Sequence, residues 1–127
     1  MSLLRGILGQ ASELSVDKLP SDFGPMLVTG ERLEKAYKVV RDLFVFTDRR
    51  LILVDKQGLT GKKTEHLSIP YKNIMLFSKE SAGFLDLDAE LKIWVRGLER
   101  PISKEFTRDS NVNDIYLLLS HYVLGQG

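Results

Sequence analysis

The sequence contains no cysteine among its 127 residues, which excludes disulfide bonds, zinc–thiolate sites and thiol catalysis. No apolar run approaches the ~20 residues that a membrane-spanning helix requires. The sequence also lacks a large excess of charge of either sign, because 18 Lys and Arg residues and 17 Asp and Glu residues leave a net charge of only +1. We therefore expect no electrostatic attraction strong enough for nucleic acid, and membrane lipid is an unfavoured partner.

The motifs of common enzymes are absent as well. The sequence has no phosphate-binding loop, nucleophile elbow or dinucleotide-binding glycine motif. No catalytic group, cofactor site or metal site is predicted, and we expect the protein not to be an enzyme. A secretory signal needs a continuous apolar block, and Arg5, Gly6 and Gly9 interrupt the N-terminal one, so we expect a cytoplasmic location.

What is present is the composition of one globular domain, with 43% hydrophobic and 28% charged residues. We predict a single domain over residues 1–127. Short runs rich in β-branched and aromatic residues alternate with turn residues along most of the chain, which is typical of antiparallel strands. About seven strands are expected, at residues 33–40, 44–47, 51–54, 63–69, 74–80, 90–96 and 102–107.

The two ends of the chain have helical patterns instead. Apolar residues recur at helical spacing over residues 110–124, which predicts a C-terminal capping helix. Residues 1–23 are expected to form an N-terminal helix and a connector, with Leu4 and Ile7 on the apolar stripe of the helix. This helix could pack on its own domain, dock on a neighbouring subunit or, less favourably, lie on a membrane surface.

The predicted hairpin of residues 44–54 is apolar on both faces, because residues of both parities are hydrophobic in its two strands. One face can belong to the core of the domain. The other face must be covered by a helix or by another chain. This is the main indication of oligomerisation in the sequence.

Together these elements predict an α+β fold: a barrel or sandwich of antiparallel strands capped by the C-terminal helix. Three motifs follow one another in this region of the chain, TDRRLI at 47–52, GLTGKK at 58–63 and SIPY at 68–71, and LDLDAELK follows at 85–92. In these motifs and their spacing the chain resembles the bacterial pleckstrin-homology-like domains, a family formerly classed only as a domain of unknown function.

The resemblance implies a pleckstrin-homology fold without known enzymatic activity. It also implies assembly into a cyclic homo-oligomeric ring, of five subunits in single-domain members, that presents a composite surface to a protein partner. Eukaryotic pleckstrin-homology domains that bind phosphoinositides use a Lys/Arg-rich loop between their first two strands. Here that joint is residues 40–43, VRDL, so phosphoinositide binding is not expected.

Trp94 is the leading candidate for an interface residue. It is the only Trp, and it falls on the polar side of its predicted strand, flanked there by Lys92 and Arg96. Trp and Arg dominate binding hot spots. Trp94 could therefore contact a sister subunit or a partner, or it could be covered within its own subunit.

A candidate basic rim is formed by Arg49, Arg50, Lys62 and Lys63, which cluster at predicted turns. Such residues usually form a solvated surface, but they could also face an acidic partner or lipid headgroups. The sequence thus favours a non-enzymatic protein-interaction module that forms a ring. The alternatives are a module for membrane surfaces or anionic lipids, and an enzyme with an unrecognised site.

Overall fold

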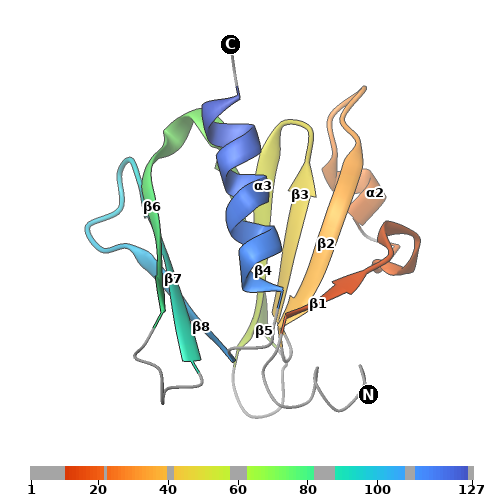
Figure 1. Ribbon diagram of the computed structural model, residues 1–127. Coiled ribbons are helices and arrows are strands. Elements are labelled where there is room, and N and C mark those ends of the chain that lie inside the picture. Colours follow the sequence, from red (N-terminus) through yellow and green to blue (C-terminus); the bar gives the residue numbers. More distant parts are fainter. Residues whose placement is uncertain are drawn as a thin grey trace.

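The computed structural model describes residues 11–21, 23–39, 42–57, 63–81, 88–107 and 111–125. They form two antiparallel sheets with one long helix at the opening between them (Figure 1). The five-stranded sheet has the order β1-β2-β3-β4-β5, and the three-stranded sheet has the order β6-β7-β8. This arrangement confirms the predicted α+β fold of antiparallel strands closed by a C-terminal helix.

The strands agree with the predicted ones and add one more at the N-terminus. Their bounds are β1 Ala11–Leu14, β2 Leu33–Val39, β3 Asp42–Thr47, β4 Arg50–Gln57, β5 Lys63–Pro70, β6 Ile74–Ser81, β7 Asp88–Val95 and β8 Ile102–Thr107. The helical elements are the 3₁₀ turns η1 Val16–Lys18 and η2 Tyr71–Asn73, the short helix α2 Phe23–Met26 and the capping helix α3 Val112–Leu124.

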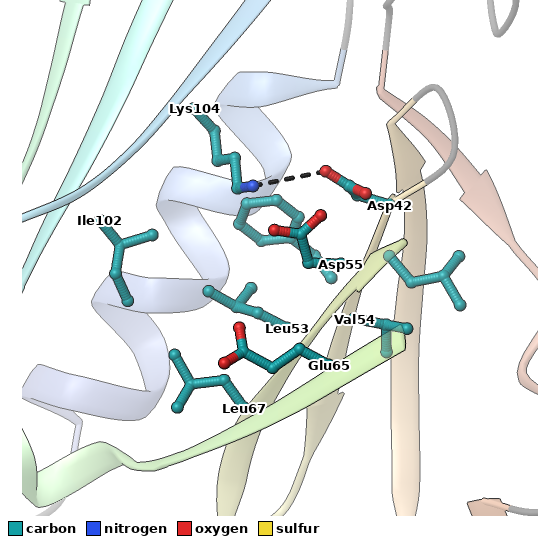
Figure 2. Close-up of a pocket in the computed structure, with 10 residues that line it drawn as sticks. Asp42, Leu53, Val54, Asp55, Glu65, Leu67, Ile102 and Lys104 are labelled. Atoms are coloured by element: carbon teal, nitrogen blue, oxygen red, sulfur yellow. Dashed lines mark hydrogen bonds and ion pairs between the residues drawn. The ribbon is translucent and has the colours of Figure 1, made fainter. Parts of the chain in front are cut away.

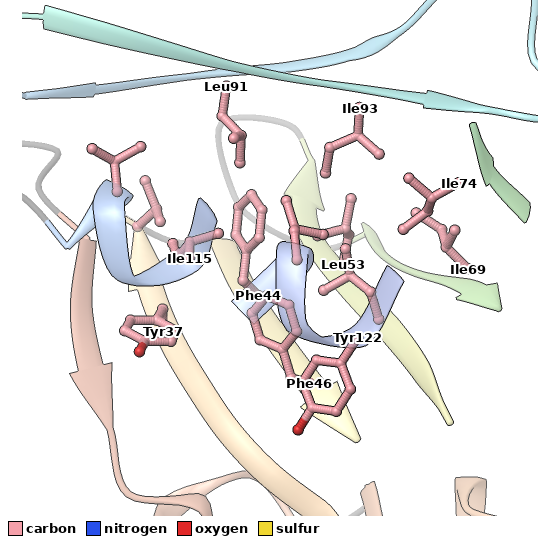
Figure 3. Close-up of a cluster of buried hydrophobic side chains, with 14 of the residues drawn as sticks. Tyr37, Phe44, Phe46, Leu53, Ile69, Ile74, Leu91, Ile93, Ile115 and Tyr122 are labelled. Carbon is pink, nitrogen blue, oxygen red and sulfur yellow. The ribbon is translucent and has the colours of Figure 1, made fainter. Parts of the chain in front are cut away.

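The main core lies between the two sheets and α3 (Figure 3). Phe44 and Phe46 from β3, Leu91 and Ile93 from β7, and Ile115 from α3 are all at most 1% exposed. Alternation in each strand sends every second side chain inward, and α3 contributes residues at helical spacing. The helix therefore closes the opening between the sheets with its apolar side.

Stacked aromatic rings hold the C-terminal half of α3 in place. The ring of Tyr122 stacks on that of Tyr71 at 4.6 Å, and on Phe46 at 5.9 Å. The Tyr71 hydroxyl donates to the backbone oxygen of Thr47 at 2.6 Å, and the Tyr122 hydroxyl donates to Glu34. A tyrosine hydroxyl is already protonated at neutral pH, and burial raises the pKa of both tyrosines further, so both act as donors.

A second apolar cluster lies on the other face of the five-stranded sheet. Val45 and Ile52 point to this face, and both are at most 1% exposed. Phe23 of α2 covers them at 1% exposure, together with half-buried side chains of residues 14–27. The cover that the hairpin was predicted to need is thus supplied by this chain's own N-terminal segment, which removes the sequence's main argument for oligomerisation.

The N-terminal prediction is wrong in part. Ala11–Leu14, expected within a helix, pairs with β2 as strand β1. The connector was expected at residues 19–25 without regular structure, but it contains the first three residues of the short helix α2. The predicted helical positions Leu4 and Ile7 lie outside the described residues.

An ion pair fastens this N-terminal segment to the turn between β3 and β4. Arg50 donates from Nε to Glu31 Oε2 at 2.8 Å and from Nη2 to Glu31 Oε1 at 3.0 Å. Its Nη2 also donates to the backbone oxygen of Met26 at 2.7 Å, and its Nη1 to Ser68 Oγ at 3.1 Å. The guanidinium therefore ties together the segment after α2, the turn and strand β5.

The carboxylate of Glu31 is satisfied on both oxygens, although its side chain is only 1% exposed. Besides Arg50, it accepts from Thr47 Oγ1 at 2.7 Å and from the Val28 amide at 3.1 Å. Desolvation raises the pKa of Glu31, but the hydrogen bonds from Arg50, Thr47 and Val28 outweigh it and leave the pKa below its ordinary value of 4.5. Glu31 is thus charged in the folded protein at neutral pH.

Replacing Phe23 with Ala should destabilise the protein by about 3–5 kcal/mol, because a fully buried ring is lost from the second cluster. Urea unfolding followed by Trp94 fluorescence measures the change. Val28→Ala is the control, since Val28 is 54% exposed and its loss should cost no more than about 0.5 kcal/mol. A Phe23→Ala cost as small as that of the control would mean that α2 does not cover the sheet.

The two partners of the ion pair should not be equivalent. Arg50→Met leaves the Glu31 carboxylate, which is 1% exposed, without its cation, and should lower the unfolding free energy by about 3–5 kcal/mol. Glu31→Gln leaves Arg50, which is 22% exposed and can regain water, so it should cost about 1–3 kcal/mol. Equal or reversed costs in urea unfolding would contradict the buried geometry of Glu31.

The stability contribution of Glu31 should depend on pH. Because folding lowers its pKa, the contribution is fully present above the ordinary carboxyl pKa and is lost as pH falls through the folded value. The difference in unfolding free energy between wild type and Glu31→Gln should therefore shrink from about pH 6 to about pH 3. A difference that stays constant over this range would rule out the lowered pKa.

Candidate functional site

The outer face of the three-stranded sheet carries the predicted interface residue Trp94. In β7, Leu91 and Ile93 point into the core at 1% exposure, so Lys92 and Trp94 project from the opposite face. Trp94 is half-buried and belongs to neither apolar cluster. Helix α3 packs on the inner face of this sheet, and no described residue outside the sheet belongs to an apolar cluster on its outer face.

A β-bulge at the start of β6 adds two apolar side chains next to Trp94. Ile74 pairs with Val95 and Leu76 pairs with Trp94, so Met75 is the extra residue of the bulge. Met75 is 57% exposed and Leu76 is 61% exposed. We call Met75, Leu76 and Trp94 the apolar patch.

Lys92 and Arg96, the two charged residues that the sequence analysis placed beside Trp94, lie near the apolar patch. Lys92 lies on the same face as Trp94, where its ammonium is 3.8 Å from the carboxylate of Glu90. Arg96 is exposed just beyond the end of β7, and its backbone amide donates to the Asn73 oxygen at 2.8 Å. An apolar centre with a charged border has the composition of a protein interface.

The sequence did not single out Met75 and Leu76. The signal that could have found them is the run of four apolar residues at 74–77. In a strand with one buried face only every second side chain faces the core, so some apolar residues of this run must lie on the other face. Which residue is extra depends on pairing with β7, and that pairing is not visible in the run itself.

The predicted basic rim is not one surface. Arg50 does not belong to it, since its guanidinium is engaged with Glu31. Arg49 is exposed at the turn before β4, whereas Lys63 lies opposite Gln57 at the far end of that strand. At a rise of about 3.3 Å per residue, β4 separates these two positions by more than roughly 20 Å. Lys62 lies outside the described residues.

A cavity of about 120 Å³ lies where strand β5 approaches strand β8, and it was not predicted. Its polar lining consists of Asp42, Asp55, Glu65 and Lys104 (Figure 2). The Lys104 ammonium is 3.4 Å from Asp42. Asp55 and Glu65 face each other in the β4–β5 hairpin, so a correct hairpin assignment could have paired them, but the contribution of β8 is non-local.

The described residues contain no group of three or more His, Cys, Asp or Glu residues that could hold a metal ion. Glu31 is the described carboxylate whose pKa is shifted, and Arg50, Thr47 and Val28 occupy its two oxygens. It is therefore a structural group. Within the same residues, no helix has the length and apolar character needed to cross a membrane.

Comparison with known proteins places this architecture among bacterial proteins. The family model described as "Bacterial PH domain" matches residues 2–123. The uncharacterized protein YjqA of Bacillus subtilis is 54% identical over 121 residues, which is 94% of this chain and 97% of YjqA.

Two crystal structures from Shewanella species have the same fold. A pleckstrin homology domain from Shewanella amazonensis is 50% identical with a TM-score of 0.81, and the match covers 97% of this chain and 99% of that one. A DUF1696-family protein with a pleckstrin-homology domain, from Shewanella loihica, is 45% identical with a TM-score of 0.79, covering 91% and 98%. These likenesses extend over nearly the whole chain.

Proposed function

The chain belongs to the bacterial PH domain family, and from that premise we propose that it is a non-enzymatic protein-interaction module that assembles into a closed ring of five copies. The ring presents a composite surface to an unidentified protein partner, and the protein works in the cytoplasm. The observation that carries the proposal is the apolar patch, which is exposed on the outer face of the three-stranded sheet.

The position of the apolar patch supports an interface between copies. The five-stranded sheet already has its outer face covered by residues 14–27, so sister copies are not needed there. The three-stranded sheet has no such cover among the described residues. In a ring, the apolar patch of one copy meets a different surface of the next, because a head-to-tail contact joins two unlike surfaces. Such contacts close into a ring when the rotation from one copy to the next closes on itself.

The ring lets the protein bind its partner through several sites at once. Each copy offers one weak site to the partner, and a closed ring holds five such sites at fixed spacing. A partner that engages several sites together gains apparent affinity without any new contact, through effective concentration. No catalytic step is required for this role.

The two alternatives have no supporting observation in the described residues. A membrane-surface module would need basic residues gathered on one face, and Arg49 and Lys63 lie at opposite ends of the β4–β5 hairpin. An enzyme would need an available reactive group, and the carboxylate with a shifted pKa is fully engaged in structural hydrogen bonds.

Light scattering on variants of the apolar patch tests the proposal. Leu76→Glu places a charge in the interface and should convert the ring to smaller species. Trp94→Ala should weaken each contact by about 2 kcal/mol, and so dissociate the ring on dilution. Leu117→Glu, at a residue that is 64% exposed on α3, is the matched control and should keep the mass of the ring.

Two outcomes would count against the proposal. A wild-type protein that is monomeric at the concentrations tested would exclude the ring. A ring whose mass is unchanged by both Leu76→Glu and Trp94→Ala would exclude the apolar patch as its interface.

A further inference from the structure

The cavity next to β8 lies at the open edge of the sandwich. Strand β5 is the last strand of the five-stranded sheet and β8 is the last strand of the three-stranded sheet. The cavity is lined from both strands, by Glu65 and Leu67 of β5 and by Ile102 and Lys104 of β8. It is therefore reached between two strand edges that are unpaired within the described residues.

The floor of the cavity is apolar. Phe44, Leu53, Leu67 and Ile102 line it, and Phe44 and Leu53 are at most 6% exposed. Its volume of about 120 Å³ compares with the roughly 150 Å³ of an apolar cavity that binds benzene. A chain of four or five carbon atoms is of the right size for this space.

The polar groups at the cavity are unevenly charged. Three of them are carboxylates, on Asp42, Asp55 and Glu65, and one is the ammonium of Lys104. Lys104 pairs with Asp42, whose other oxygen accepts the Lys56 amide at 3.2 Å. Figure 2 shows this ion pair and Glu65 on two sides of Leu53. The lining thus contains three carboxylates and one ammonium group.

Asp55 and Glu65 form the part of this lining that lacks a counter-charge. They stand directly opposite each other on β4 and β5, and like charges in that relation destabilise a sheet. Within the described residues neither carboxylate has a cation within 4 Å, whereas Asp42 has Lys104. A bound cation would relieve this repulsion.

We propose that the cavity binds a primary alkylammonium group, supplied by a lysine side chain of a protein partner. The aliphatic stem of lysine fits the apolar floor, and its compact ammonium can sit between the carboxylates of Asp55 and Glu65. A protein is the source because an extended segment could pair with the edge of β5, which is unpaired within the described part of the chain, while its lysine enters the cavity. The protein source of the ammonium rests on the proposed function, whereas the binding of an alkylammonium group in the cavity does not.

Nuclear magnetic resonance titration tests the chemistry of the cavity directly. The probes are pentylammonium, pentanol and pentanoate, which share a chain length and differ in charge. Pentylammonium should shift the methyl signals of Leu53, Leu67 and Ile102, and should bind at least about fivefold more tightly than pentanol. Pentanoate should not bind. Equal binding of pentylammonium and pentanol, or shifts confined to other residues, would overturn the proposal.

Single substitutions assign the effect to the carboxylates. Asp55→Asn and Glu65→Gln should each weaken pentylammonium binding by about fivefold, and neither should lower the melting temperature, because each removes a like-charge contact. Lys104→Met should strengthen binding. Glu105→Gln is the matched control, since Glu105 is exposed on β8, the strand of Lys104, but does not line the cavity. If Glu105→Gln weakened pentylammonium binding as much as Glu65→Gln, the effect would come from the net charge of the protein, and the proposed site would be overturned.

A peptide pair identifies the source of the ammonium. A blocked Val-Lys-Val peptide should bind at least about tenfold more tightly than pentylammonium, because strand pairing adds to the contact in the cavity. The peptide with norleucine in place of lysine should bind no better than pentanol. A lysine peptide no tighter than the free amine would overturn the protein source. A monomeric wild-type chain, which would exclude the ring, leaves these measurements of the cavity intact.

Discussion

The ion pair between Glu31 and Arg50 is the contact on which the rest of this structure depends. Arg50 binds Glu31 at 2.8 and 3.0 Å and also reaches Met26 and Ser68, so one guanidinium joins three parts of the chain. A buried ion pair is stable only when its remaining hydrogen-bonding groups are satisfied, and here both oxygens of Glu31 are. The TDRRLI and SIPY motifs thus have a structural meaning, since Thr47, Arg50, Ser68 and Tyr71 all take part in this network.

This contact determines which surface is left for other proteins. By fastening the segment that carries Phe23, it keeps the outer face of the five-stranded sheet covered within the chain. The apolar patch on the three-stranded sheet has no equivalent cover among the described residues. The two sheets therefore differ among the described residues: one has its outer face covered by its own chain, and the other exposes apolar side chains on its outer face. The proposed ring uses the outer face of the three-stranded sheet, whereas the proposed lysine site uses the open edge between β5 and β8.

Much of the fold could be predicted from the sequence, because alternation and turn residues are local signals. They located β2 to β8, and helical spacing located α3. Strand β1 was missed because the apolar residues at 11 and 14 fit a helix, and only pairing with β2 makes the segment a strand. For the same reason the inward direction of Arg50, the bulge at Met75 and the cavity between β5 and β8 could not be predicted. Each depends on a partner that is distant in the sequence.

Hydrogen–deuterium exchange at two protein concentrations, one above and one below the assembly threshold, tests whether the apolar patch is the interface of the proposed ring. Assembly should slow exchange at the start of β6 and the end of β7, next to the apolar patch. Strands β3 and β4 should exchange equally slowly at both concentrations, because this chain covers them itself. Concentration-dependent protection of β3, β4 or α2, with none near Leu76 and Trp94, would contradict the account.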